Sequence, residues 1–299
     1  MPVPHPVVPL ESLDPSRHEV EVAGGTTAYW VYGPPDAAHT VIAVHGFRGE
    51  HHGLEPVVAA LPGIRIISPD LPGFGETPPL PGRTHDIDAY AEWLRAFAAA
   101  VAPGAVILGH SFGSIVAAAA VSAGLPTPRL ILVNPIGAPA LEGPRGVLTR
   151  LAIFYYWAGA RLPERLGTGV LRSGAIVRVM SVSMAKTDDK ALRRFIHEQH
   201  DTYFSRFADR DVLRDAFVTS VSHDVSEYAS GVEVPTLLVA ADRDDITPIE
   251  AERRLARLFP DAELVEIADV GHLIHYEKPL EAAAAITRFL EAPVGDGTR

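Results

Sequence analysis

One pentapeptide of this 299-residue chain combines a possible nucleophile with the glycines needed to present it. Gly109-His110-Ser111-Phe112-Gly113 follows the apolar run AVIL and precedes an alanine-rich stretch, the strand–turn–helix context that a G-x-S-x-G motif requires. Side chains two positions before and after Ser111 would obstruct so sharp a turn, which explains the glycines. The serine would start a helix, where partial positive charge favours a developing anion. We therefore interpret Ser111 as a catalytic nucleophile rather than as part of an inert Gly/Ser loop.

A serine nucleophile needs a base, and the chain offers 13 histidines. His272 follows the late strand AELVEIAD, at the kind of strand end where open α/β sheets place ligand-facing groups. His275 is the alternative base. If it is not catalytic, it would begin a helix or lie on the surface. Four other histidines are expected on solvated faces: His51, His52, His197 and His200.

The base in turn needs an acid to orient it. The segment ADRDD (241–245) follows the strand PTLLVAA, so Asp242, Asp244 and Asp245 all qualify by spacing alone. Asp242 could instead stabilise the turn, and Asp245 could cap the next helix. The chain order Ser, Asp, His is the one expected with this type of serine turn.

The elements that must position these residues form an alternating pattern of strands and helices. A hairpin is expected at 18–23 and 26–33, followed by apolar strands buried on both faces. These later strands are predicted at 40–46, 64–70, 105–111, 129–135, 235–242 and 262–269. We therefore predict an α/β fold with a mostly parallel eight-stranded sheet and helices on both of its faces.

The alternation lapses between Pro135 and about Val232, where helical spacing and scattered arginines replace the buried strands. This predicts a discontinuous core, residues 1–135 plus 232–299, interrupted by a helical cap or lid at 136–231.

With these motifs in place, the chain resembles the α/β-hydrolase fold superfamily over about residues 18–135 and 232–291. His45-Gly46-Phe47 resembles the oxyanion-hole loop of the family, and Asp70-Leu71-Pro72-Gly73-Phe74-Gly75 resembles its D-x-x-G-x-G segment. In the family's acid loop the aspartate stands four residues before a proline, which here is Pro248 and selects Asp244. The segment beginning at Gly271 likewise selects His272.

Three further positions differ from the pattern common in the family or bear on the choice of acid. Asn134 occupies the alternative acid position of some relatives and is not an acid, which favours Asp244. Arg48 stands where proline is frequent, and Ser114 stands where a second glycine is common; neither belongs to the expected triad.

The resemblance implies a serine hydrolase that cleaves a carboxylic ester or lactone through an acyl-enzyme, with Ser111, His272 and Asp244 as the triad. The backbone N–H groups of Phe47 and Phe112 would form the oxyanion hole. No metal, organic cofactor or other cofactor-binding residue is expected. Serine rather than aspartate at position 111 argues against dehalogenase or epoxide hydrolase chemistry.

Alternative activities of the same fold remain open at this point. One is hydrolysis of a C–C bond in a diketone-type ring-fission product, although such relatives usually have Trp where this chain has Leu273. Another is an amidase or peptidase, and a third is a ligand receptor without turnover. An apolar carbonyl compound is the expected substrate, and Trp157 of the cap would line its pocket unless the cap aromatics pack only against each other and the core. Arg48 would bind a substrate carboxylate or form an ordinary surface ion pair.

The composition of the chain limits its possible binding partners and its possible location. The net charge of −11 and the lack of a Lys/Arg-rich run argue against nucleic-acid binding. The absence of cysteine excludes disulfides and thiolate chemistry. No apolar run predicts a membrane span, and a proline-rich start without basic residues does not predict a secretory signal. We expect a cytoplasmic enzyme, and its oligomeric state is not specified by these patterns.

Overall fold

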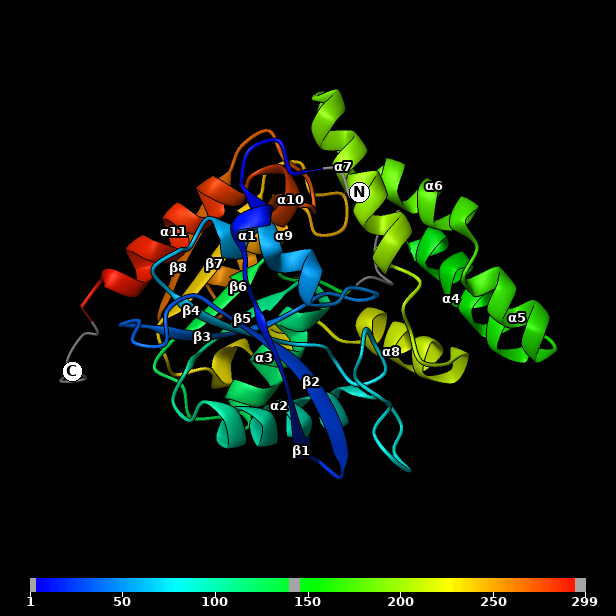
Figure 1. Cartoon of the computed structure of the whole chain (residues 1–299), viewed down its shortest axis with the longest axis horizontal. Helices are drawn as coiled ribbons and strands as arrows, with labels where there is room; N and C mark the ends of the chain where they lie inside the picture. The colour runs from blue at the N-terminus through cyan, green and yellow to red at the C-terminus, as the bar shows by residue number, and fades with distance from the viewer. Residues whose placement is uncertain (1–3, 140–145, 294–299) are drawn as a thin grey trace.

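The computed structural model describes residues 4–139 and 146–293. Its centre is an eight-stranded sheet in the order β1-β2-β4-β3-β5-β6-β7-β8 (Figure 1). Only the β1–β2 and β2–β4 pairs are antiparallel; the other neighbours run parallel. The strands are β1 Ser16–Val22, β2 Gly25–Tyr32, β3 Thr40–Val44, β4 Arg65–Pro69, β5 Val106–His110, β6 Leu130–Val133, β7 Thr236–Ala241 and β8 Ala262–Ile267.

The hairpin that opens the sheet is closed by Ala23 and Gly24, both with positive φ (51° and 80°). Two successive residues of positive φ match the right-handed twist of the paired strands, which brings Val22 opposite Gly25. The predicted hairpin is confirmed, with its turn one residue earlier than the two-glycine pattern suggested.

Helices cover both faces of the sheet, as predicted. Alternate β3 residues divide between two apolar clusters: Ile42 and Val44 pack with helices α2, α3 and α9, whereas Val41 and Ala43 pack with α1 and α11. The edge strand β8 departs from the prediction of burial on both faces, because only Ile267 is buried in it. These helices are α1 Glu55–Ala59, α2 Ile87–Val101, α3 Phe112–Ser122, α9 Ile249–Ala256, α10 Ile274–Glu277 and α11 Pro279–Glu291.

In the described part of the chain, five α-helices lie between β6 and β7, and we call them the helical insertion. Figure 1 shows its helices α4 to α7 gathered on the side of the molecule opposite α11. They are α4 Gly146–Arg161, α5 Glu164–Leu171, α6 Gly174–Met184, α7 Lys190–Tyr203 and α8 Arg210–Ser222. Short 3₁₀ turns complete the fold at Leu10–Ser12, His51–Leu54, Val225–Glu227 and Ala229–Gly231.

The division into a core (1–135 plus 232–299) and a cap (136–231) stays a prediction, and its residues 1–3, 140–145 and 294–299 lie outside the described part of the chain. Among the described helices, none has the length and apolar character needed to cross a bilayer.

Candidate active site

Ser111 stands on a strained turn between β5 and α3. Its backbone has φ 53° and ψ −120°, a conformation that costs a non-glycine residue free energy. A Cβ atom on Gly109 would lie 2.3 Å from the carbonyl oxygen of Gly113, and one on Gly113 would lie 2.3 Å from that of Val44. Both glycines of the motif are therefore required by close backbone approach, as their spacing predicted.

Hydrogen bonds join Ser111 to the two other residues that the sequence selected. The Ser111 hydroxyl donates to Nε2 of His272 at 2.8 Å, and Nδ1 of His272 donates to Oδ2 of Asp244 at 2.7 Å. Asp244 follows β7, His272 follows β8 and Ser111 follows β5, so the ends of three strands bring the residues together. His272 and Asp244 are both buried, which shields their interaction from water.

The acid loop holds the Asp244 carboxylate in place. Its Oδ1 accepts the backbone N–H groups of Ile246 (2.7 Å) and Thr247 (3.2 Å). Burial alone would raise the pKa of Asp244, but the charge and hydrogen bond of His272, together with these N–H groups, hold that pKa below its usual value. The residue is thus kept ionised beside the imidazole.

The neighbouring aspartates have other partners. Asp242 accepts the N–H of Val270 at 3.3 Å and stabilises the turn, and Asp245 pairs with Lys186. Of the three candidate acids, Asp244 is the one that contacts His272.

Two residues support the site in ways that sequence patterns did not reveal. Asn134, which follows β6 and is not an acid, donates from Nδ2 to Oδ2 of Asp244 at 3.2 Å and so helps to position the Asp244 carboxylate. The Ser114 hydroxyl donates to the carbonyl of Ser111 at 2.5 Å and accepts the N–H of Ile136 at 3.2 Å. Comparison with the family pattern placed both near the site, but the Asn134–Asp244 and Ser114–Ile136 hydrogen bonds join segments that are distant in sequence.

The two backbone groups predicted for the oxyanion hole flank Ser111. Phe112 is the first residue of α3, where an N–H has no acceptor within its own helix. The loop of Phe47 lies against the serine, since a Cβ atom on Gly46 would stand 3.1 Å from Cβ of Ser111. His45 fixes this loop by donating from Nδ1 to the carbonyl of Gly46 (2.8 Å) and accepting the N–H of Leu71 (2.9 Å).

A cavity of about 520 Å³ opens over Ser111 and His272. Core residues such as Phe47 form part of its wall, and the insertion contributes the rest, including Tyr156 of α4 and Phe217 of α8. Tyr156 and Phe217 stack with ring centroids 4.1 Å apart. The cavity is thus mainly apolar around the serine.

Arg48 does not have the role expected of it. Its side chain is only 2% exposed and is not part of the cavity wall. The guanidinium donates to the carbonyls of Phe204 (2.8 Å) and Leu171 (3.0 Å) and to the hydroxyl of Tyr156 (3.3 Å). A substrate carboxylate could not reach it, so the substrate-binding hypothesis is wrong for this residue. Arg48 instead ties the oxyanion loop to the helical insertion.

Trp157 also lies away from the cavity. The indole is 47% exposed, stacks with Phe154 at a centroid distance of 5.8 Å and has Arg161 over its ring. The helix turns this side chain outward because Tyr156, the adjacent residue, takes the inner face. The prediction that Trp157 lines the pocket is therefore wrong.

His275, the alternative base, is buried on α10 with its ring 4.0 Å from that of His110, rather than exposed. The expectation of solvated faces fails for His51 and His200, which are both buried, and His52 and His197 are half-buried.

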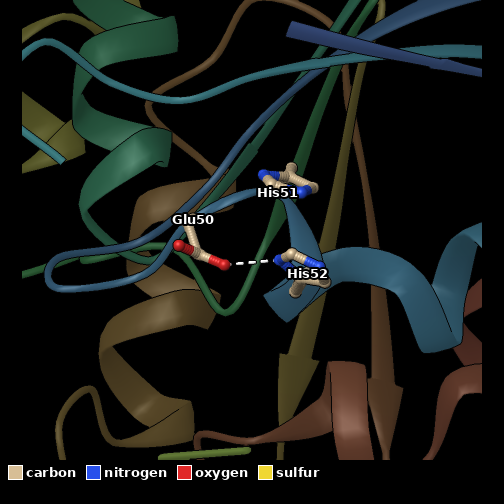
Figure 2. A group of neighbouring side chains, drawn as sticks. All are labelled: Glu50, His51 and His52. Carbon is tan, nitrogen blue, oxygen red and sulfur yellow. Dashed lines mark hydrogen bonds and ion pairs between the residues drawn. The ribbon is translucent and has the colours of Figure 1, made fainter. Parts of the chain in front are cut away.

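Among the described residues, one group has the donor atoms for a metal ion: Glu50, His51 and His52, whose ligand atoms lie within 4.8 Å of one another (Figure 2). Nδ1 of His51 donates to Asp70 at 2.9 Å, and His52 donates to Glu50. Both Nδ1 atoms are therefore engaged by carboxylates, and we interpret the group as a hydrogen-bonded network.

Comparison with known proteins identifies the family. A family model described as the α/β-hydrolase fold matches residues 39–279, most of the chain. The chain belongs to the α/β-hydrolase fold family.

Relatives within the α/β hydrolases carry out different reactions. Lipase 1 of Psychrobacter immobilis is 23% identical over 79% of this chain and 72% of its own length. A proline iminopeptidase of Pestalotiopsis fici is 26% identical over 87% of this chain and 94% of its own. The structure of the enol-lactonase of Burkholderia xenovorans LB400 superposes with a TM-score of 0.76 at 18% identity, covering 92% of this chain and 100% of that one. At that identity the structural likeness shows the fold alone.

Proposed function

We propose that this α/β hydrolase is a serine hydrolase that cleaves a carboxylic ester or lactone through an acyl-enzyme. The observation that carries the proposal is the continuous relay from Asp244 through His272 to Ser111, which opens into an apolar cavity. The similarity to a lipase supports ester chemistry. A small apolar carbonyl compound suits the cavity, and the proposed reaction needs no metal or organic cofactor.

In the proposed mechanism, Oγ of Ser111 attacks the carbonyl carbon while Nε2 of His272 takes the hydroxyl proton. Asp244 keeps the imidazole in the required tautomer and stabilises the imidazolium. The N–H groups of Phe47 and Phe112 donate to the developing oxyanion, an interaction worth roughly 3–4 kcal/mol per donor in comparable sites. His272 then protonates the departing alcohol.

Deacylation repeats these steps with water. His272 accepts a proton from the water that attacks the acyl carbon, the tetrahedral intermediate collapses, and Ser111 recovers its proton as the acid leaves. Residues 136–231 would act as a lid, since the insertion forms much of the cavity wall and thereby excludes bulk water.

A parallel screen of esters, lactones, amides and C–C-bonded diketones against wild type and Ser111→Ala tests this function. We expect steady turnover of esters or lactones that Ser111→Ala abolishes. A stoichiometric burst without turnover would indicate a receptor instead. Preferential cleavage of amides or diketones would favour one of the alternative reactions of the fold.

A further inference from the structure

Helix α4 turns two aromatic rings and an arginine to solvent. Phe154 is 61% exposed and Trp157 is 47% exposed, and their rings stack at a centroid distance of 5.8 Å. Arg161, one turn further along, lies over the Trp157 ring at 5.8 Å. These residues stand three and four positions apart, so they share one face of the helix. We call Phe154, Trp157 and Arg161 the outer ridge of α4.

Exposed apolar side chains are more frequent in α4 and α5 than elsewhere. Of the twelve large apolar side chains that are exposed in the described part of the chain, five lie within residues 154–170. Besides the two rings of the outer ridge, they are Leu162, Leu166 and Val170. Single exposed apolar residues are common on soluble proteins, whereas a concentration of them indicates an interaction surface.

The helices that carry these side chains are positively charged, in contrast to the rest of the protein. Residues 146–184, which span α4 to α6, contain five arginines and one acidic residue, Glu164, and so have a net charge of +4. The whole chain has a net charge of −11, so all other residues together carry −15. Within residues 4–139 and 146–293, no acidic side chain pairs with the exposed Arg161 or Arg165, whereas Arg178 pairs with Asp201. The free cations would attract an anionic partner.

An anionic lipid surface matches both the charge and the exposed rings. Tryptophan and phenylalanine bury their rings at the boundary between head groups and acyl chains, and arginines pair with anionic head groups. The Trp157–Arg161 pair supplies both kinds of group within one turn. A second copy of the chain docked through the same face would instead bring like charges together. An acidic protein would attract the arginines but leave the rings exposed to water.

The opposite side of α4 forms part of the wall of the catalytic cavity. Ala152, Tyr155 and Tyr156 line that cavity, and the helical period places them across the helix from the outer ridge. One helix, about 10 Å in diameter, therefore separates the ridge from the cavity. A lipid surface on the ridge would lie close to the cavity.

We propose that the outer ridge of α4 docks on an anionic phospholipid surface. The rings of Phe154 and Trp157 insert among the head groups, and Arg161 and Arg165 face the phosphates. This binding function goes beyond the proposed hydrolysis and does not depend on it. If both hold, docking brings the cavity next to esters that are dissolved in the lipid.

Vesicle binding by Ser111→Ala, a variant chosen so that no lipid is hydrolysed, tests the docking. Co-sedimentation would compare vesicles of equal parts phosphatidylglycerol and phosphatidylcholine with vesicles of phosphatidylcholine alone. We expect the partition coefficient to be about 10-fold or more larger on the anionic vesicles. It should fall several-fold between about 0.1 M and about 1 M salt, because salt screens the charges. Equal partition into both kinds of vesicle, or none into either, would overturn the proposal.

Tryptophan fluorescence shows whether the outer ridge is the part that inserts. The chain has three tryptophans, of which Trp30 and Trp93 are buried and Trp157 is exposed. Anionic vesicles should therefore shift the emission to shorter wavelength and protect Trp157 from quenching by acrylamide. Trp157→Phe should still bind the vesicles without this shift. Binding of the tryptophan-containing protein with unchanged emission and quenching would contradict insertion of the ridge.

Substitutions in the ridge measure its share of the binding. Phe154→Ala/Trp157→Ala should lower the partition coefficient about 10-fold or more, since two rings lose their contact with lipid. Arg161→Gln should lower it about five-fold, which corresponds to about 1 kcal/mol for one basic residue near the surface. The matched control is Leu258→Ala/Leu280→Ala, which removes two similarly exposed apolar side chains elsewhere and should bind as Ser111→Ala does. Equal losses in the ridge and control variants would refute the assignment.

Two further comparisons separate this proposal from its alternatives. Sedimentation velocity over a range of protein concentrations would detect self-association, and a dimer that Phe154→Ala/Trp157→Ala abolishes would identify a second copy as the occupant and overturn lipid docking. Ester assays on wild type are read independently of vesicle binding. Binding by Ser111→Ala without ester turnover by wild type would leave the docking standing and remove the proposed hydrolysis. Ester turnover without vesicle binding would do the reverse.

Discussion

Replacing Arg48 with methionine tests whether this side chain joins the oxyanion loop to the helical insertion or binds substrate. The guanidinium makes three hydrogen bonds, to Phe204, Leu171 and Tyr156. Each such bond from a charged donor contributes about 1.5–3 kcal/mol. Removing the cation also removes its desolvation cost, so we expect a net loss of about 3–5 kcal/mol in the free energy of unfolding.

Urea unfolding and calorimetry measure this loss, which should appear as a fall in Tm of roughly 10 °C. Arg161→Met, which alters an exposed arginine over Trp157, is the matched control and should change stability by less than about 0.5 kcal/mol. Displacement of Phe47, next to Arg48, should also lower kcat for every ester.

The same variant is then assayed with methyl butyrate and monomethyl succinate, which differ by a carboxylate. Because Arg48 is buried away from the cavity, the ratio of their kcat/KM values should be the same in wild type and Arg48→Met. Unchanged stability together with a selective loss on the succinate ester would refute this reasoning and restore Arg48 as a substrate-binding residue.

The remaining predictions concern the acid, the cavity wall and a buried histidine. Asp244→Asn should lower kcat about 10⁴-fold, because the amide favours the wrong imidazole tautomer. Asp242→Asn should keep kcat within several-fold of wild type. Steady-state kinetics measures both, and a larger loss in Asp242→Asn would contradict the geometry. Phe217→Ala should change the dependence of kcat/KM on acyl-chain length, by about 0.8 kcal/mol for each methylene that loses contact. Trp157 faces outward, so Trp157→Ala should leave this dependence unchanged. A change seen only in Trp157→Ala would contradict the assignment of the cavity wall. Burial lowers the pKa of His200 to about 3. Below about pH 6.5 the histidine of the unfolded chain therefore binds a proton that the folded protein does not bind. The free energy of unfolding is thus highest above that pH and decreases as the pH falls. From urea unfolding curves, the fall in the free energy of unfolding between pH 7 and pH 5 should be about 2 kcal/mol smaller in His200→Asn than in wild type. Equal falls would contradict the neutral state of the buried His200.

The fold could be predicted from the sequence because its signals are local and repeated. Apolar runs such as the one before Ser111 mark strands, and the glycines beside the serine mark a turn that few other residues permit. The positions of Ser111 and His272 relative to strand ends followed from the same local patterns. For Asp244, spacing left three candidates, and a resemblance was needed to choose among them.

The failed predictions concern residues whose environment is set by distant segments. Arg48 looks like a surface charge in sequence, but its partners lie more than 100 residues away in the insertion. Trp157 and Tyr156 are adjacent in a uniformly apolar stretch, and only the packing of α4 against α5 and α8 decides which one faces the cavity. The Trp30 ring stacks on His51, which begins a 3₁₀ turn and hydrogen-bonds to Asp70 after β4. Such side-chain environments depend on tertiary packing rather than on local pattern.

Trapping of the acyl-enzyme tests the central claim most directly. The protein would be mixed with a slowly hydrolysed p-nitrophenyl ester, quenched in acid within the burst, and digested for mass spectrometry. We expect the mass of the acyl group on the peptide that contains Ser111, and no adduct in Ser111→Ala. Steady ester turnover by Ser111→Ala, or an adduct that forms on another residue, would contradict it.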